Sequence, residues 1–123
     1  MKAKRRHDRV PLMADVTIQP GQEDSARFGG AVFNVSRGGM AVFTEYFFPP
    51  GRLVSLELIL PVEGDGLRGI TLYGVTRWIL VDAGGNTLGI ELLTDPKAGD
   101  YAWFDEHFDL YVGSHGRSRE SAK

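Results

Sequence analysis

Residues 10–19 read Val10-Pro11-Leu12-Met13-Ala14-Asp15-Val16-Thr17-Ile18-Gln19. Every second side chain in this stretch is apolar, namely Val10, Leu12, Ala14, Val16 and Ile18. Because successive side chains of a β-strand point to opposite faces, this alternation predicts a strand with one buried face. Pro20-Gly21 is expected to end the strand, and the polar run from Gln22 to Ser25 is expected to form a loop.

Five further stretches have strand-like patterns, over residues 27–35, 40–44, 53–60, 70–81 and 87–93. The clearest is 53–60, in which apolar residues alternate from Val54 to Leu60. Both registers of 70–81 carry apolar residues, so its inward face stays open. Gly29-Gly30 indicates a bulge or a close backbone approach, and Gly74 indicates a bulge. Residues 82–86 are expected to form a hairpin loop.

The pattern changes after residue 94. Asp95 is a good helix N-cap and Pro96 a good first helical residue. Aromatic residues then recur at helical spacing, at Tyr101, Phe104, Phe108 and Tyr111, and Gly113 is expected to end the helix. The fold class predicted is therefore all-β with one C-terminal α-helix, arranged as a six-stranded antiparallel β-barrel with the helix packed against it.

This pattern divides the chain into a flexible arm over residues 1–9, a barrel with its helix over 10–112, and a disordered polar tail over 113–123. A chain of 123 residues accommodates one domain. It contains no cysteine, which excludes disulfide scaffolds and thiol catalysis. No run approaches the roughly 18 apolar residues of a spanning helix, so a cytoplasmic protein without membrane insertion is expected.

The formal net charge is −2, which argues against a nucleic-acid-coating protein. The charge is unevenly placed, because five of the first nine residues are Lys or Arg. An acidic stretch near the C-terminus holds Asp100, Asp105, Glu106 and Asp109. A basic arm on a mildly acidic body suggests either a small anionic ligand or an intramolecular contact. The three histidines show no metal-ligand spacing, and Ser36 has no expected base partner, so no enzyme activity is predicted.

Two segments carry binding chemistry. The first holds Arg5, Arg6 and Arg9, whose guanidinium groups can bind phosphate oxygens, stack on flat rings and bond the O6 and N7 edge of guanine. Taken alone, this segment could equally be a solvated basic tail.

The second segment is the turn Asn34-Val35-Ser36-Arg37-Gly38-Gly39. Asn34 offers an amide for a base edge and Ser36 a hydroxyl. Gly38 and Gly39 permit positive φ and let a ligand approach the backbone. Taken alone, the segment could equally be an ordinary hairpin turn.

Together the two segments resemble the PilZ domain family. Its arginine pattern R-x-x-x-R is met by Arg5 and Arg9, and its [D/N]-x-S-x-x-G pattern by Asn34, Ser36 and Gly39. The likeness covers roughly residues 5–112. It implies a six-stranded β-barrel that binds the bacterial second messenger cyclic di-GMP and no other cofactor.

By the same resemblance, Arg5 and Arg9 are the principal clamps on the ligand and Arg6 assists them. Asn34 and Ser36 would read a guanine edge, and Gly38 and Gly39 would give the space. The resemblance also implies signalling to an unidentified effector protein in trans. The alternative is a protein-interaction adaptor of the same fold with weak or no nucleotide binding.

Three more residues have open roles. Trp78 either lines the ligand face or packs in the core. Arg77 and Arg37 are expected to be solvated or structural charges, with phosphate contact as the other possibility.

Overall fold

The computed structural model describes residues 10–21, 26–62 and 66–109. The predictions for the arm at 1–9, for Tyr111 and Gly113, and for the tail at 113–123 lie outside these residues. No helix of the described part is long and apolar enough to cross a membrane.

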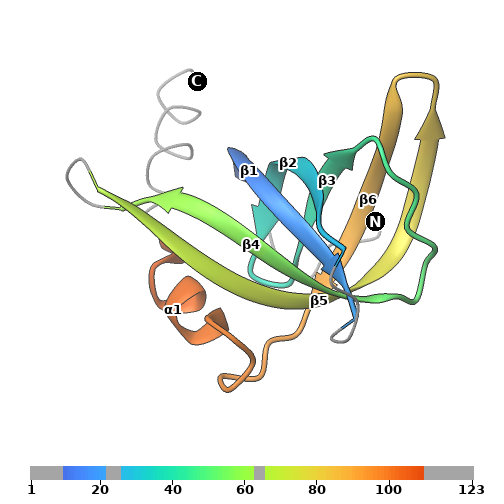
Figure 1. The fold of residues 1–123 in the computed structure, drawn as a ribbon. Helices are drawn as coiled ribbons and strands as arrows, with labels where there is room; N and C mark the ends of the chain where they lie inside the picture. Colours follow the sequence, from blue (N-terminus) through green and yellow to red (C-terminus); the bar gives the residue numbers. More distant parts are fainter. Residues whose placement is uncertain (1–9, 22–25, 63–65, 110–123) are drawn as a thin grey trace, which may run out of the picture.

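Six antiparallel strands form a closed barrel in the order β1-β2-β3-β6-β5-β4, as Figure 1 shows. Their bounds are β1 Val10–Pro20, β2 Phe28–Ser36, β3 Gly39–Thr44, β4 Leu53–Pro61, β5 Leu67–Asp82 and β6 Gly85–Leu92. The helix α1, Tyr101–Glu106, follows and lies beside the barrel. The predicted fold class is confirmed.

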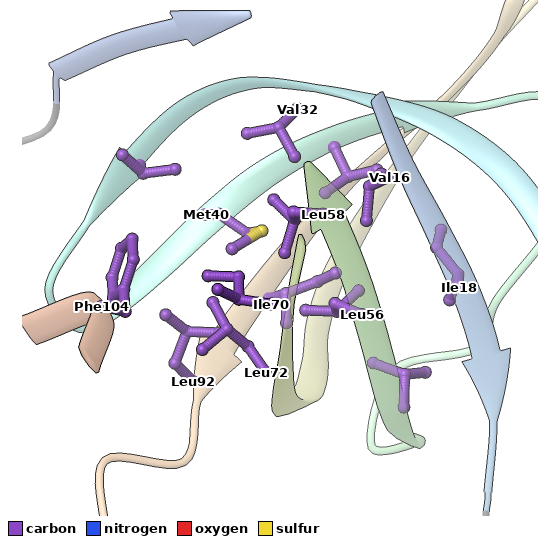
Figure 2. Packing of buried hydrophobic residues seen from close by; sticks show 14 of the residues in the cluster. Val16, Ile18, Val32, Met40, Leu56, Leu58, Ile70, Leu72, Leu92 and Phe104 are labelled. Carbon is purple, nitrogen blue, oxygen red and sulfur yellow. The ribbon is translucent and has the colours of Figure 1, made fainter. Parts of the chain in front are cut away.

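Alternation along the strands places the core inside the barrel. In β4 the even-numbered residues Val54 to Leu60 are buried, as predicted, and Glu57 and Ile59 are exposed. Phe104 reaches from α1 into the same cluster, where Figure 2 shows it among strand side chains such as Met40 and Leu92. The barrel interior and one face of α1 therefore share one apolar core.

The structure shows which residues of β5 face the barrel interior, a point that the sequence left open. Ile70 and Leu72 face inward, and so does Thr76. The pairing with β6 then shifts at Arg77, between Thr76 and Trp78. This bulge changes which face odd and even residues occupy, and that explains why both registers of the stretch carry apolar residues.

The predicted bulge at Gly74 is wrong, because Gly74 pairs regularly with Val54 and Leu92. Glycine is required at this position by close packing, because a Cβ there would lie 2.7 Å from the Glu91 carbonyl oxygen. At Gly30 the close approach is correct, with the Phe43 oxygen 2.8 Å from a built Cβ. The loop predicted over 82–86 is shorter, because β6 begins at Gly85.

The predicted helix start is also wrong. Asp95 does not cap a helix; its carboxylate accepts the Lys97 N–H at 2.8 Å within a separate turn. Gly99 then takes a φ of +56°, and α1 begins only at Tyr101. The Asp100 carboxylate, which precedes the helix, accepts the N–H of Thr71 on β5 at 2.7 Å. A contact with the barrel therefore sets where the helix starts.

Candidate ligand-binding site

The β2–β3 hairpin carries the predicted recognition turn. Arg37 and Gly38 form the turn, and Ser36 pairs with Gly39 where the strands meet. The Ser36 hydroxyl oxygen accepts the N–H of Gly38 at 3.2 Å and of Gly39 at 3.1 Å, with only 5% of the residue exposed. Ser36 therefore holds the shape of this turn.

Gly39 is required by the barrel itself. A Cβ on Gly39 would lie 2.5 Å from the carbonyl oxygen of Ile90 on β6. Gly38 and Gly39 do not use the positive φ that glycine permits, since the positive-φ glycines of the described chain are Gly21, Gly51, Gly85 and Gly99. Close contact between strands, rather than an unusual backbone angle, excludes a side chain at Gly39.

The closed strand order aligns one row of residues across five strands. Opposite partners in this row, read from β1 through β2, β3 and β6 to β5, are Pro11, Asn34, Ala41, Gly89 and Trp78. The adjacent row runs through Val35, Met40, Ile90 and Thr76, all buried in the barrel interior. Since neighbouring residues in a strand face opposite sides, the first row faces outward.

Four members of this outward row form what we call the outer shelf: Asn34, Ala41, Gly89 and Trp78. The indole of Trp78 lies over Gly89 so closely that a Cβ there would collide with it. Trp78 is 41% exposed, so the core-packing alternative for this residue is wrong. The shelf has a half-buried amide at one end, a partly exposed indole at the other and small residues between them.

Charged groups lie around the shelf in fixed pairs. Arg77 contacts Glu91 at 2.6 Å, and both side chains are about half exposed. Arg37 contacts Asp105 of α1 at 2.7 Å and Asp109 at 3.5 Å, and its guanidinium lies 4.7 Å from the Phe108 ring centre. The acidic C-terminal stretch therefore binds a cation of the turn, and Arg37 is a structural charge.

A second bond links the turn to the helix. The Tyr101 hydroxyl donates to the Arg37 carbonyl oxygen at 2.8 Å. Burial raises the pKa of Tyr101, the nearby Asp105 carboxylate raises it further, and Arg37 partly offsets both. The neutral phenol is thus the form that fits this contact.

The arginines of the arm lie outside the described residues, which begin at Val10. Val10 pairs with Val35, and Pro11 pairs with Asn34 at the start of the row. The described chain therefore begins beside the recognition turn.

Metal and nucleophile chemistry find no support in the described residues. They contain no group of three or more His, Asp or Glu side chains placed to hold a metal ion. The Ser36 hydroxyl is bonded to the backbone of its own turn. What the shelf offers instead is an amide for hydrogen bonds and an aromatic face for stacking.

Comparison with known proteins agrees with this geometry. The PilZ domain family matches residues 3–107, nearly the whole chain. This chain belongs to the PilZ domain family. This match confirms the predicted resemblance. PilZ domains are a family that binds c-di-GMP.

Solved structures share the fold. The c-di-GMP-bound PilZ domain of YcgR from Escherichia coli is 17% identical, with a TM-score of 0.63 and 98% of each chain covered. The inhibitor of motility MotI/DgrA from Bacillus subtilis is 27% identical, with a TM-score of 0.62 over 74% of this chain. This chain spans 43% of the MotI length. The MrkH–c-di-GMP complex from K. pneumonia is 16% identical, with a TM-score of 0.60 and 92% of this chain covered, against 55% of MrkH. No curated protein matches by sequence.

Sequence reasoning missed two shelf residues and one contact. Ala41 and Gly89 were not singled out, although small residues at outward strand positions are a signal for a close approach. The pairing of Arg37 with α1 joins segments 68 residues apart, and no local pattern indicated it.

Proposed function

We propose that this PilZ domain is a cyclic di-GMP receptor, which holds the nucleotide between the arginine arm and the outer shelf and signals to a partner protein in trans. The observation that carries the proposal is the pairing of Pro11 with Asn34. The strand that follows the R-x-x-x-R segment therefore pairs with the first residue of the [D/N]-x-S-x-x-G segment, which supports the proposal.

The shelf chemistry suits one guanine base. The Asn34 side chain can donate to and accept from a base edge, and the Trp78 indole offers a flat apolar surface on which a base can stack. Ala41 is 3% exposed and the Trp78 indole covers Gly89, so the Asn34 amide and the exposed part of the indole are the groups that a base would contact. Ser36, Gly38 and Gly39 contribute by fixing the turn that presents Asn34.

The arm supplies what the shelf lacks, because a cyclic dinucleotide carries two phosphate charges. Arg37 is held by α1 and Arg77 by Glu91, so the cations for phosphate would come from Arg5 and Arg9, with Arg6 assisting. Ordering the arm opposes binding by about 1–2 kcal/mol for each backbone residue that is fixed. Charge-assisted hydrogen bonds to phosphate offset this cost.

The direct test is isothermal titration of nucleotide-free protein with cyclic di-GMP. We expect Arg5→Ala and Arg9→Ala each to weaken binding by about 1.5–3 kcal/mol, the range for hydrogen bonds to charged groups. Trp78→Ala is expected to weaken it by about 1–3 kcal/mol through lost stacking. The matched control is Arg27→Ala, because Arg27 is half exposed and pairs with Glu57 on β4, away from the shelf.

Two results would overturn the proposal. Wild-type protein that releases no heat, and shows no binding by a second method, is not a receptor, and the adaptor alternative would then stand. Equal losses in Arg27→Ala and Arg9→Ala would mean that only general positive charge matters. A cytoplasmic location and the absence of catalysis belong to the proposal, since the second messenger would act as a ligand.

A further inference from the structure

The β5–β6 hairpin extends beyond the closed barrel wall, and there one side of β5 has no paired strand among the described residues. β4 pairs with β5 only from Leu67 to Val75, whereas β5 continues to Asp82. The last bonds on that side join Thr76 to the backbone of Gly51 and Arg52. Beyond Thr76, the backbone of β5 pairs only with β6 among the described residues. Figure 1 shows this part of β5 and β6 as a hairpin that extends from the barrel.

We call residues 77–82 of β5 the open edge. Its sequence is Arg77-Trp78-Ile79-Leu80-Val81-Asp82, and the pairing with β6 is regular from Trp78 onward. Leu80 is 63% exposed and Val81 69%. Alternate residues of an antiparallel strand direct their backbone N–H and C=O groups to opposite sides. In the open edge, the groups on one side face β6, and those on the other side face no strand of the described residues. An exposed apolar edge of this kind is a template for another strand, and the features that can block pairing, the bulge with Arg77 and the charge of Asp82, lie at its two ends.

We propose that the open edge is the docking surface for a second copy of this chain, which pairs with it as an antiparallel strand about a two-fold axis. The opposite charges at the two ends of the open edge favour pairing with a second copy of this chain. Arg77 begins the segment and Asp82 ends it. In an antiparallel pair of identical segments, the Arg77 end of each copy lies next to the Asp82 end of the other, whereas a parallel pair would bring like charges together.

The side chains between these ends are also self-complementary. A two-fold axis perpendicular to the sheet requires one residue to lie opposite its own copy. With Ile79 at the centre, Leu80 lies opposite Trp78 of the copy; with Leu80 at the centre, Ile79 lies opposite Val81. In both registers apolar side chains meet, and aromatic and β-branched cross-strand pairs stabilise such sheets.

The test is the mass of the full chain in solution, by light scattering after gel filtration at increasing protein concentration and without nucleotide. We expect a dimer of the 13.6 kDa chain. Leu80→Lys is expected to weaken the dimer about tenfold or more, or 1.4 kcal/mol upward, since a lysine at the edge must lose its hydration on pairing. The control is Ile59→Lys, because Ile59 is similarly exposed at 59% but lies on β4, away from the open edge. Circular dichroism checks that both variants are folded.

Because the chain has no cysteine, single cysteines can then report the register. Oxidation is expected to cross-link either Ile79→Cys or Leu80→Cys into a covalent dimer, and to leave Ile59→Cys monomeric. A monomer at every concentration overturns the proposal, as does a dimer that Leu80→Lys leaves intact. Larger assemblies would also overturn it, because a two-fold pair is closed. The measurement needs no nucleotide, so its failure is independent of the proposed function.

Discussion

At the scale of single residues, Gly39 gives the sharpest prediction. Gly39→Ala places a methyl group 2.5 Å from the Ile90 oxygen, in a backbone contact that no side-chain rotation relieves. We expect a loss of about 1–3 kcal/mol in the free energy of unfolding, the usual cost of overpacking. The measurement is urea denaturation followed by circular dichroism. The control is Gly29→Ala, where a Cβ meets nothing within 4 Å and the change should be within about 0.5 kcal/mol. Equal losses in the two variants would contradict the contact.

The same residue shows how far the motif could be interpreted from sequence. From sequence, Gly39 was expected to permit positive φ and to give space to a ligand, and the role toward a ligand stays a prediction. The structure assigns the need for glycine to β6, which becomes a neighbour of β3 only when the barrel closes. Ser36 differs, because its hydroxyl accepts the N–H groups of Gly38 and Gly39 within its own turn. A residue pattern specifies which side chain is required, whereas the contacts of distant strands determine the reason.

At the scale of elements, alternation predicted β4 and β1 because each has one inward face along its length. It did not resolve β5, where the bulge at Arg77 exchanges the two faces. The helix start was misplaced for a related reason. Asp95-Pro96 has the local chemistry of a helix start, but Gly99 and the bond from Thr71 to Asp100 place the first turn five residues later. Local patterns fail where a contact between elements is the stronger constraint.

The contact between α1 and the recognition turn predicts a pH dependence. The folded state keeps Tyr101 protonated to a higher pH than the unfolded chain, whose tyrosines titrate near pH 10.0. The stability from Tyr101 is therefore fully present below pH 10, and it is lost as the pH rises toward the folded pKa, because the unfolded state releases its proton first. Urea denaturation at neutral pH and above pH 10 measures this loss.

Tyr101→Phe separates the two contributions of this side chain. It is expected to lower stability by about 0.5–1.5 kcal/mol at neutral pH, through the lost bond to the Arg37 oxygen, and to reduce the alkaline loss. Tyr46→Phe is the control, since Tyr46 is 46% exposed. An alkaline loss that is unchanged in Tyr101→Phe would show that another group causes it.

At the scale of the whole molecule, strand order assembles the outer shelf. Asn34 and Ala41 come from one hairpin, Trp78 and Gly89 from another, and the two hairpins meet because β6 lies between β3 and β5. Six strands and closure could be predicted from the spacing of apolar stretches. The strand order could not, because several circular orders satisfy the same alternation. That is why Trp78 kept two possible roles at the level of sequence.

Because four strands contribute to the shelf, only the folded barrel should bind the nucleotide. Cyclic di-GMP at about 100 times its dissociation constant is therefore expected to raise the free energy of unfolding by about 2.7 kcal/mol, and the Tm by several degrees. Differential scanning calorimetry measures the shift. Arg9→Ala, ahead of β1, should unfold at the wild-type temperature without nucleotide and gain less when the same nucleotide concentration is added. If Arg9→Ala and wild type gained equally, the arm would not take part in binding. If neither gained, the assembled shelf would not be a nucleotide site, since a ligand that binds only the folded state must stabilise it.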